Sequence, residues 1–172
     1  PYYSHGLDPI VRRNEFKLCG ILNGIDPDYY NPETDRALFA NYNAEDTAGK
    51  AVCKEELQRM LNLPVKSETP IIAMITRLVS HKGLDLVKEV IEQALRQDIQ
   101  FVLLGTGDSM YENYFSDLAR RYQGKVVSII SFNSDLSRKI YSGADIFLMP
   151  SKSELCFAQS ERKGISQVSA RT

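Results

Sequence analysis

The sequence contains no tryptophan, only 2 histidines and only 3 cysteines. The cysteines, Cys19, Cys53 and Cys156, are odd in number and widely separated, without the paired spacing of a zinc site. We therefore expect neither a disulfide framework nor a bound metal, and a reducing cytosol fits best. His5 and His81 have no serine or aspartate at a spacing typical of a catalytic triad.

The sequence also lacks an excess of charge and a long apolar run. Its 21 basic and 22 acidic residues give a net charge of −1, so no general attraction to nucleic acid or to an anionic membrane is expected. No apolar run approaches the roughly 18 residues that a membrane span needs. The chain opens at PYYSHGLDPI without a methionine and has 172 residues, which suggests a fragment or processed piece that forms one domain.

What the sequence does contain is a regular alternation of apolar runs and helical stretches. Strands are predicted at 71–76, 100–108, 125–132 and 145–151, and helices at 83–97, 109–123 and 135–144. Runs that are apolar on both faces, separated by helices, are typical of a parallel sheet covered on both sides. The predicted fold class is therefore α/β, a Rossmann-like parallel sheet with helices on both faces.

The two ends of the chain are less regular. A short apolar strand is predicted at 18–22, followed by turns at Asn23-Gly24 and Asp26-Pro27. An amphipathic helix is predicted within 43–63, with an apolar face formed by Ala51, Leu57, Met60 and Leu61. Residues 155–172 show neither helical periodicity nor a strand pattern, so the sheet is expected to end at 145–151 with an exposed edge.

Ligands of such sheets bind beyond the carboxyl ends of the strands, which directs attention to the residues that follow each strand. Arg77 and Lys82 lie where a guanidinium and an ammonium could hold a diphosphate, although both could also be solvated loop cations. Gly105, Gly107 and Asp108, in GTGD, allow a close approach of backbone or ligand, or form a simple helix-capping turn. GTGD lacks the third glycine of a dinucleotide fingerprint, and GxxxxGK is absent.

The two later strands offer further candidates. Phe132 and Asn133 could receive a base, while core packing would explain Phe132 equally well. Glu154 follows the last predicted strand and could equally be a surface carboxylate. Tyr29 and Tyr30 are interpreted as packing or loop aromatics, because their spacing does not resemble a base-stacking platform.

Four motifs in order give a resemblance that none of them gives alone: GILNGIDPDYYNPETD (20–35), RLVSHKGLDL (77–86), LLGTGD (103–108) and SGADIFLMPSKSE (142–154). Together they closely resemble bacterial glycogen synthases and plant starch synthases. The resemblance implies a two-domain GT-B glycosyltransferase that moves glucose from ADP-glucose or UDP-glucose to the non-reducing end of an α-1,4-glucan. It further implies retention of configuration without a metal or other cofactor, and places this chain in the C-terminal, nucleotide-sugar-binding half.

The resemblance also implies roles for individual residues. Arg77 and Lys82 are similar to the pair that neutralises the diphosphate, and Glu154 to the carboxylate that holds the donor glucose. The remaining candidates at the nucleotide sugar are Gly105, Gly107 and Asp108 in the loop, Phe132 beside the base, and Cys156, whose region supplies backbone amides. Residues 1–17 resemble the segment leaving an N-terminal domain, 18–154 the nucleotide-binding domain, and 155–172 a divergent tail.

The tail departs from the family pattern, because Leu155 replaces a proline and the glycine expected after Cys156 is missing. Without this glycine and the other domain, the chain alone is expected to be inactive. A non-catalytic nucleotide-binding or regulatory module remains an alternative. Another glycosyltransferase, such as a sucrose synthase, is disfavoured by the specific motifs. The compartment implied is the cytoplasm for a bacterial protein and a plastid for a plant protein.

Overall fold

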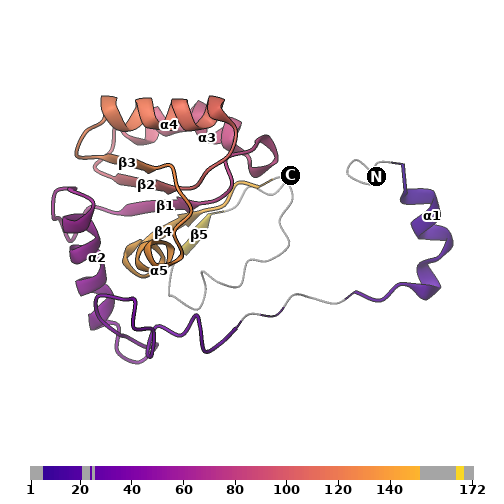
Figure 1. The fold of residues 1–172 in the computed structure, drawn as a ribbon, viewed down its shortest axis with the longest axis horizontal. Helices are drawn as coiled ribbons and strands as arrows, with labels where there is room; N and C mark the ends of the chain where they lie inside the picture. The colour runs from indigo at the N-terminus through magenta and orange to yellow at the C-terminus, as the bar shows by residue number, and fades with distance from the viewer. Residues whose placement is uncertain (1–5, 21–23, 25, 152–165, 169–172) are drawn as a thin grey trace.

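The computed structural model of the protein describes residues 6–20, 24, 26–151 and 166–168. The described strands form one parallel sheet of five in the order β3-β2-β1-β4-β5, shown in Figure 1. The strands are β1 (Ile71–Ile75), β2 (Gln100–Leu104), β3 (Val126–Ile129), β4 (Ile146–Leu148) and β5 (Ser166–Val168). The helices are α1 (Asp8–Arg13), α2 (Ala48–Met60), α3 (Leu84–Ala94), α4 (Ser109–Arg121) and α5 (Ser134–Gly143), with short 3-10 turns η1 (Glu15–Lys17) and η2 (Ser80–Lys82).

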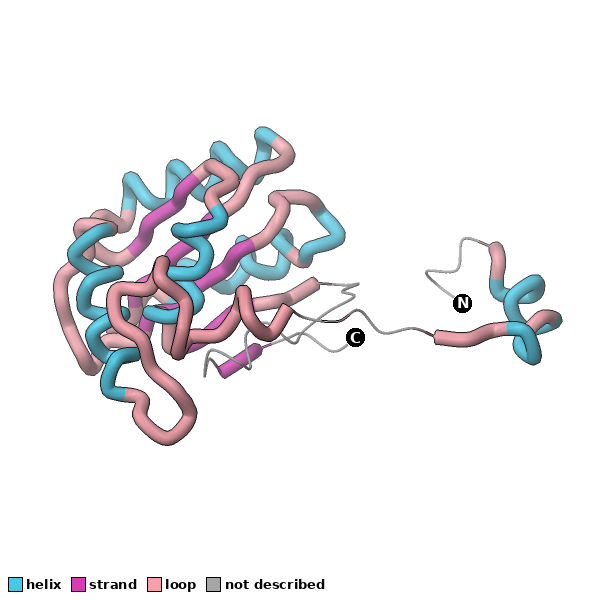
Figure 2. Tube along the Cα trace, turned by 60° about the horizontal axis from the view of Figure 1, so that its bottom comes forward, coloured by secondary structure: helices cyan, strands magenta, loops and turns pink. Residues whose placement is uncertain are grey.

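The helices cover both faces of the sheet, as the sequence predicts. Figures 1 and 2 show α3 and α4 on one face, with α2 and α5 on the other. Each pair packs through its own apolar cluster, one containing Phe115 of α4 and Leu84 of α3, the other Leu57 of α2 and Ile140 of α5. All five residues of β2 are buried, which is why Phe101–Leu104 form a continuous apolar run rather than an alternating one. The predicted α/β class is confirmed.

The prediction for residues 18–22 is wrong where the structure describes it. Residues 18–20 are not in a strand, and Leu18 is 56% exposed. A strand needs a neighbouring strand to satisfy its backbone groups, and Figure 1 shows this stretch together with α1 lying apart from the sheet. Residues 21–23 lie outside the described part.

The expectation that residues 155–172 contain no strand is wrong at 166–168. Ser166–Val168 forms β5, which pairs in parallel with β4 and covers the edge that the sequence predicts to be free. Three residues are too few to show a periodicity, and the pairing depends on the position of β4 rather than on local sequence. The other expectations for the tail fall on 152–165 and 169–172, outside the described residues.

The helix predicted within 43–63 exists but is shorter, and its predicted apolar face is correct only in part: Leu57 is buried and Leu61 packs against the same cluster. Its buried residues are Cys53, Leu57 and Gln58, whereas Ala51 and Met60 are exposed. The reason lies in α5, where a Cβ added to Gly143 would come 2.8 Å from Leu57 Cδ2 and 2.9 Å from the Cys53 carbonyl oxygen. The two helices therefore pack almost backbone to backbone, a tertiary constraint that the sequence periodicity of one helix does not contain.

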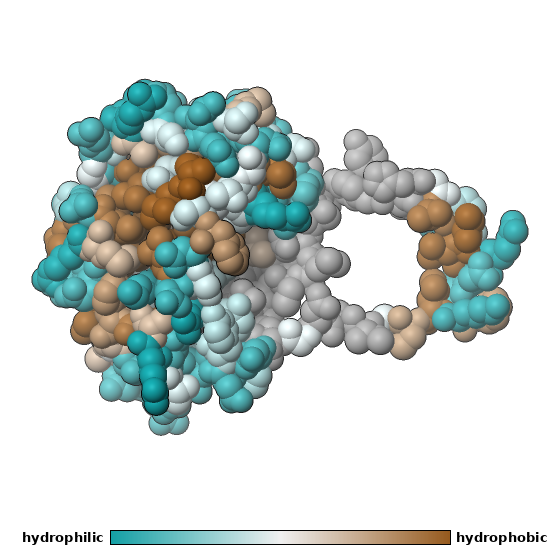
Figure 3. All heavy atoms as spheres, viewed as in Figure 1, coloured by the Kyte–Doolittle hydropathy of each residue, from teal (hydrophilic) through white to brown (hydrophobic). Residues whose placement is uncertain are grey.

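Figure 3 shows apolar residues along the middle of one face. Exposed large apolar side chains occur on several elements, among them Val52 of α2, Val90 of α3 and Met110 of α4. They also gather on the segment of α1 and η1, which buries none of its residues. No described helix is long and apolar enough to cross a membrane.

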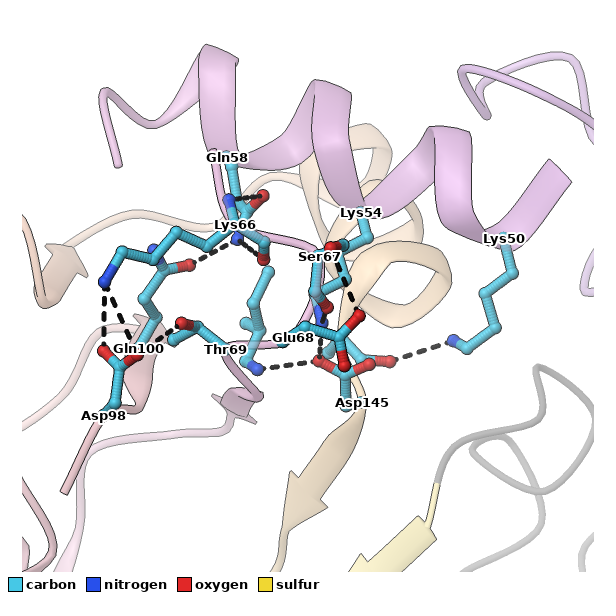
Figure 4. A network of polar contacts seen from close by, with 12 residues as sticks. Lys50, Lys54, Gln58, Lys66, Ser67, Glu68, Thr69, Asp98, Gln100 and Asp145 are labelled. Carbon is cyan, nitrogen blue, oxygen red and sulfur yellow. Dashed lines mark hydrogen bonds and ion pairs between the residues drawn. The ribbon is translucent and has the colours of Figure 1, made fainter. Parts of the chain in front are cut away.

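A polar network ties α2 to the amino ends of β1 and β2 (Figure 4). Lys50 Nζ donates to the carbonyl oxygens of Ser142 and Ala144, at 3.0 and 2.9 Å, and so satisfies carbonyls at the end of α5. Lys54 Nζ lies 2.9 Å from Asp145 Oδ2, which also accepts the Ile71 amide at 2.8 Å. This end of the sheet is therefore fixed by polar contacts between elements far apart in the sequence.

The same network gives a pH-dependent prediction for Asp98. A hydrogen bond from Thr69 Oγ1, at 2.9 Å, and then the ammonium of Lys66 hold the pKa of the Asp98 carboxyl below its ordinary value. A depressed pKa in the folded state stabilises the fold above about pH 4, the unfolded value, and this contribution is lost as pH falls through the folded pKa. Thr69→Val should raise the Asp98 pKa. The free energy of unfolding of this variant should approach that of the unsubstituted protein in acid, where Asp98 is protonated in both. A carboxyl NMR titration measures the shift, and an unchanged pKa would contradict the assignment.

Candidate functional site

The site is built at the carboxyl ends of the strands, where the chain reverses direction across the sheet. From β1 the chain proceeds outward to β2 and β3, and then returns to place β4 on the other side of β1. In open parallel sheets this reversal leaves a crevice between the two strands concerned, here β1 and β4. The loops that follow β1, β2, β3 and β4 surround this crevice.

Two hollows lie at this edge. The first hollow, of about 280 Å³, lies beyond β1 and β2 and beside the start of α5. The second hollow, of about 220 Å³, lies beyond β1 and β4. The first is lined by Tyr30, Ile75, Thr76, Arg77, Leu104, Gly105, Thr106, Ser131, Phe132, Asn133, Ser134, Ser137 and Tyr141. The second is lined by Met74, Ile75, Thr76, Arg77, Lys82, Leu148, Met149, Pro150 and Ser151.

Arg77 lies between the hollows and lines both of them. Its side chain is exposed, and within the described residues its guanidinium has neither a hydrogen bond nor an ion pair. The backbone around it is nevertheless ordered, because the Val79 amide donates to the Arg77 carbonyl oxygen at 3.0 Å. A cation held at a strand end without an acidic partner is available to an anionic ligand.

Lys82 lines the second hollow from the end of η2, where it is half-buried. The next residue, Gly83, packs against the backbone of Pro150 after β4. The contact between Gly83 and Pro150 thus holds Lys82 close to the end of β4. Arg77 and Lys82, which the sequence pairs by spacing, are brought to one site by the structure.

The glycines of GTGD allow a close approach of backbone to backbone. A Cβ on Gly105 would lie 1.9 Å from the Thr76 carbonyl oxygen, and one on Gly107 would lie 2.3 Å from that of Leu78. The parallel pairing of β1 with β2 thereby continues into the loops, with a bridge between Leu78 and Gly107. The close approach of backbone to backbone that the sequence predicts is therefore observed, and a contact with a ligand stays a prediction.

The loop residues differ in their relation to the hollows. Gly105 lines the first hollow, whereas Gly107 and Asp108 line neither. The Gly107 amide donates to Glu112 Oε1 at 2.8 Å, and Asp108 is the N-cap residue of α4. Asp108 occupies the N-cap position without a capping hydrogen bond from its side chain, and its proximity to a ligand stays a prediction.

Phe132 and Asn133 both line the first hollow but have different surroundings. Phe132 is 93% exposed, so core packing does not explain it. Asn133 is the N-cap of α5, where its Oδ1 accepts the Leu136 amide at 2.9 Å. A large aromatic ring left in solvent at the rim of a hollow is available to stack on a planar group.

Tyr30 is a lining residue that the sequence does not single out as a candidate. It lies in a turn, as a loop aromatic, and lines the first hollow from a segment more than a hundred residues away from α5. The available signal was the turn chemistry of DPDYYNPETD, because Asp-Pro and Asn-Pro steps fix the path of a chain. These turns predict that the chain changes direction, but they do not predict which element the segment contacts.

Other predicted residues and properties lie outside what the structure tests. Glu154 and Cys156 fall within 152–165, outside the described residues. Among the described residues, no group of three or more His, Cys, Asp or Glu side chains could hold a metal ion.

Close to the first hollow, a hydrogen bond to Asp135 and then the charge of Asp35 raise the pKa of the Arg138 guanidinium. Arg138 therefore carries its charge at all ordinary pH values.

Comparison with known proteins gives consistent matches. The sequence model of the family described as "Glycosyl transferases group 1" matches residues 57–168. A glycogen synthase from Clostridium acetobutylicum is 50% identical over 156 residues, 91% of this chain and 33% of that protein. A glycogen synthase from Thermosipho africanus is 47% identical over 154 residues, 90% of this chain and 32% of that protein. The chain thus spans about a third of the length of these relatives.

Solved structures agree with the sequence relatives. The catalytic domain of starch synthase IV from Arabidopsis thaliana, bound to ADP and acarbose, superposes with a TM-score of 0.88 at 34% identity, covering 95% of this chain and 35% of that chain. A glycosyltransferase from Rickettsia africae superposes with a TM-score of 0.62 at 21% identity, covering 94% of this chain and 42% of that chain. The second likeness shows a shared fold.

Proposed function

Because the chain belongs to the group 1 glycosyltransferases, we propose that it binds the nucleotide-sugar donor of a glycogen- or starch-synthase reaction across the two hollows. The position of Arg77 carries this proposal. It is an exposed cation at the point where the hollows meet, without a partner among the described residues. Each hollow is somewhat smaller than a typical ligand pocket of roughly 300–1,000 Å³, but a ligand that occupies both has the room expected for a small molecule.

The lining residues of the two hollows suit different parts of the nucleotide sugar. The second hollow contains Lys82, so it takes the diphosphate together with Arg77. The first hollow is largely apolar and carries Phe132 and Tyr30 at its surface, so it takes the nucleoside. As the glycosidic bond to the leaving nucleotide breaks, negative charge grows on the diphosphate, and the two cations Arg77 and Lys82 stabilise it more than they stabilise the ground state.

The remaining roles belong to the same proposal. Glu154 is assigned to the donor glucose hydroxyls, Cys156 and its neighbours to backbone amides near the sugar, and the acceptor to an α-1,4-glucan. The ADP bound to the starch synthase supports ADP-glucose as the donor rather than UDP-glucose. The bacterial relatives, with identities of 47% and 50%, support the cytoplasmic alternative. Since the chain spans about a third of these relatives, we propose that it binds nucleotide without elongating glucan by itself.

A calorimetric titration of the 172-residue chain with ADP tests the proposal. Arg77→Ala should weaken binding by about 1.5–3 kcal/mol, the value of a charge-assisted hydrogen bond, or roughly 10- to 150-fold in Kd. Arg96→Ala is the matched control. It removes the same charge from an exposed arginine near the amino ends of the strands, away from both hollows, and should leave the Kd unchanged.

Two outcomes would contradict the proposal. One is the absence of ADP binding in a chain that circular dichroism shows to be folded. The other is an equal loss of affinity in both variants, because this would mean that ADP senses only the overall charge of the protein.

A further inference from the structure

The wall of the first hollow that carries Tyr30 is a segment of consecutive turns, residues 26–35, here called the wall segment. Asp26 Oδ1 accepts the amides of Asp28 and Tyr29, at 3.0 and 2.9 Å. At its other end the Asp35 amide donates to the Asn31 carbonyl oxygen at 2.9 Å. These local bonds fix the shape of the wall segment, but they do not determine where it lies relative to the hollow.

Its position is set by contacts with α5. Arg138 Nη1 lies 2.8 Å from Asp35 Oδ1, and the exposed fractions of the two side chains are only 16% and 0%. The same guanidinium lies over the ring of Tyr29, 4.7 Å from its centroid. The Tyr29 hydroxyl is in turn 2.7 Å from Ser134 Oγ, and Ser134 lines the first hollow.

Tyr30 thus sits beside a residue that is bonded to α5, and the Tyr29 and Tyr30 rings meet edge to face at 4.8 Å. Arg138 itself lines neither hollow. Its Nε is buried without a hydrogen-bond partner among the described residues. A buried ion pair of this kind contributes little net stability, but removing one member is costly, and such pairs fix the alignment of the elements that they join.

We propose that Arg138 and Asp35 are a positioning pair that docks the wall segment on α5 and holds Tyr30 against the nucleoside half of the donor site. The inference rests on the proposed function, since it concerns the same site. It predicts that breaking the pair weakens recognition of the nucleoside and leaves recognition of the diphosphate intact, because Arg77 and Lys82 are carried by the other side of the site.

The test compares two probes on Arg138→Met, which removes the charge and retains much of the side-chain volume. In calorimetric titrations of the 172-residue chain, the Kd for ADP should rise about tenfold, an effect expected when a binding surface loses its preorganisation. The Kd for inorganic pyrophosphate should stay within about twofold, since it lacks the nucleoside. Arg138→Lys retains a charge opposite Asp35 without the planar guanidinium, and should give an intermediate Kd for ADP.

Asp135→Asn is the matched control. Asp135 also bonds to Arg138, through Nη2 at 2.6 Å, but its side chain is 72% exposed. Removing this charge should leave both affinities unchanged, because the pair with Asp35 persists. An Asp135→Asn effect as large as that of Arg138→Met would overturn the inference.

A spectroscopic readout follows the wall segment directly. Because the sequence contains no tryptophan, Tyr30→Trp introduces a single fluorophore at the wall. Adding Arg138→Met should shift its emission to longer wavelength and reduce the change caused by ADP. Emission that is the same in both backgrounds would show that Arg138 does not position the wall, and would overturn the inference even if no nucleotide binds.

The remaining outcomes are decisive as well. Equal losses for ADP and pyrophosphate would assign Arg138 a merely structural role and overturn the inference. If pyrophosphate fails to bind the unsubstituted chain, the proposed function of Arg77 is wrong, and the emission of the Tyr30→Trp variants still decides the role of the pair. If Arg138→Met does not fold, Arg138→Lys gives the comparison between the two probes.

Discussion

Gly83→Ala should lower the free energy of unfolding by about 2–5 kcal/mol, whereas Gly124→Ala should lower it by about 1–2 kcal/mol. Both glycines have a left-handed backbone, with φ of +73° and +77°, so alanine causes similar conformational strain at each. They differ in their neighbours. A Cβ on Gly83 would lie 2.1 Å from the Pro150 carbonyl oxygen, while one on Gly124 would meet only Pro64 side-chain atoms at 3.7 and 3.8 Å.

Urea denaturation of the two variants measures the difference. Gly83 follows Lys82, and Pro150 lines the second hollow, so relief of the collision must move one side of the site away from the other. ADP affinity should therefore fall in Gly83→Ala and stay unchanged in Gly124→Ala. Equal losses of stability would mean that Pro150 can shift without cost, and that the close approach does not hold the site together.

The parallel sheet could be predicted from the sequence because its central strands, β1 and β2, are largely buried. β2 is covered on both faces and paired on both edges, so every residue must be apolar or satisfied internally, and the run Phe101–Leu104 is apolar throughout. The strand ends follow from the same pattern, and this placed Arg77 and Lys82 correctly at one edge. Local composition was sufficient there because burial acts on each strand separately.

Features that depend on distant contacts could not be predicted in this way. Tyr30 lines the first hollow from a segment whose Asp35 pairs with Arg138 of α5, and no periodicity links residues so far apart in the chain. The buried face of α2 is determined by Gly143 of α5, and β5 exists only as the neighbour of β4. In each case the decisive partner lies on another element.

Gln58→Ala should lower the free energy of unfolding by about 2–4 kcal/mol without changing the Kd for ADP. The Gln58 amide donates to Gln100 Oε1 at 2.8 Å and to the Lys66 carbonyl oxygen at 3.1 Å, and its Oε1 accepts the Lys66 amide at 3.1 Å. Truncation leaves these groups without a partner in a buried region, and each such group costs about 1–3 kcal/mol, partly relieved by entering water. Urea denaturation and calorimetry measure the two quantities.

The network around Gln58 (Figure 4) joins the amino ends of the strands, whereas the hollows lie at their carboxyl ends. Lys66→Met is the control, since it breaks only the exposed pair with Asp98 and should cost less than about 1 kcal/mol. Arg77→Ala should show the converse of Gln58→Ala, with lost affinity and retained stability, because an exposed cation without a described partner contributes little to folding. Loss of ADP affinity in a folded Gln58→Ala protein would instead mean that the two ends of the sheet are energetically coupled, and that the donor site depends on the packing of α2.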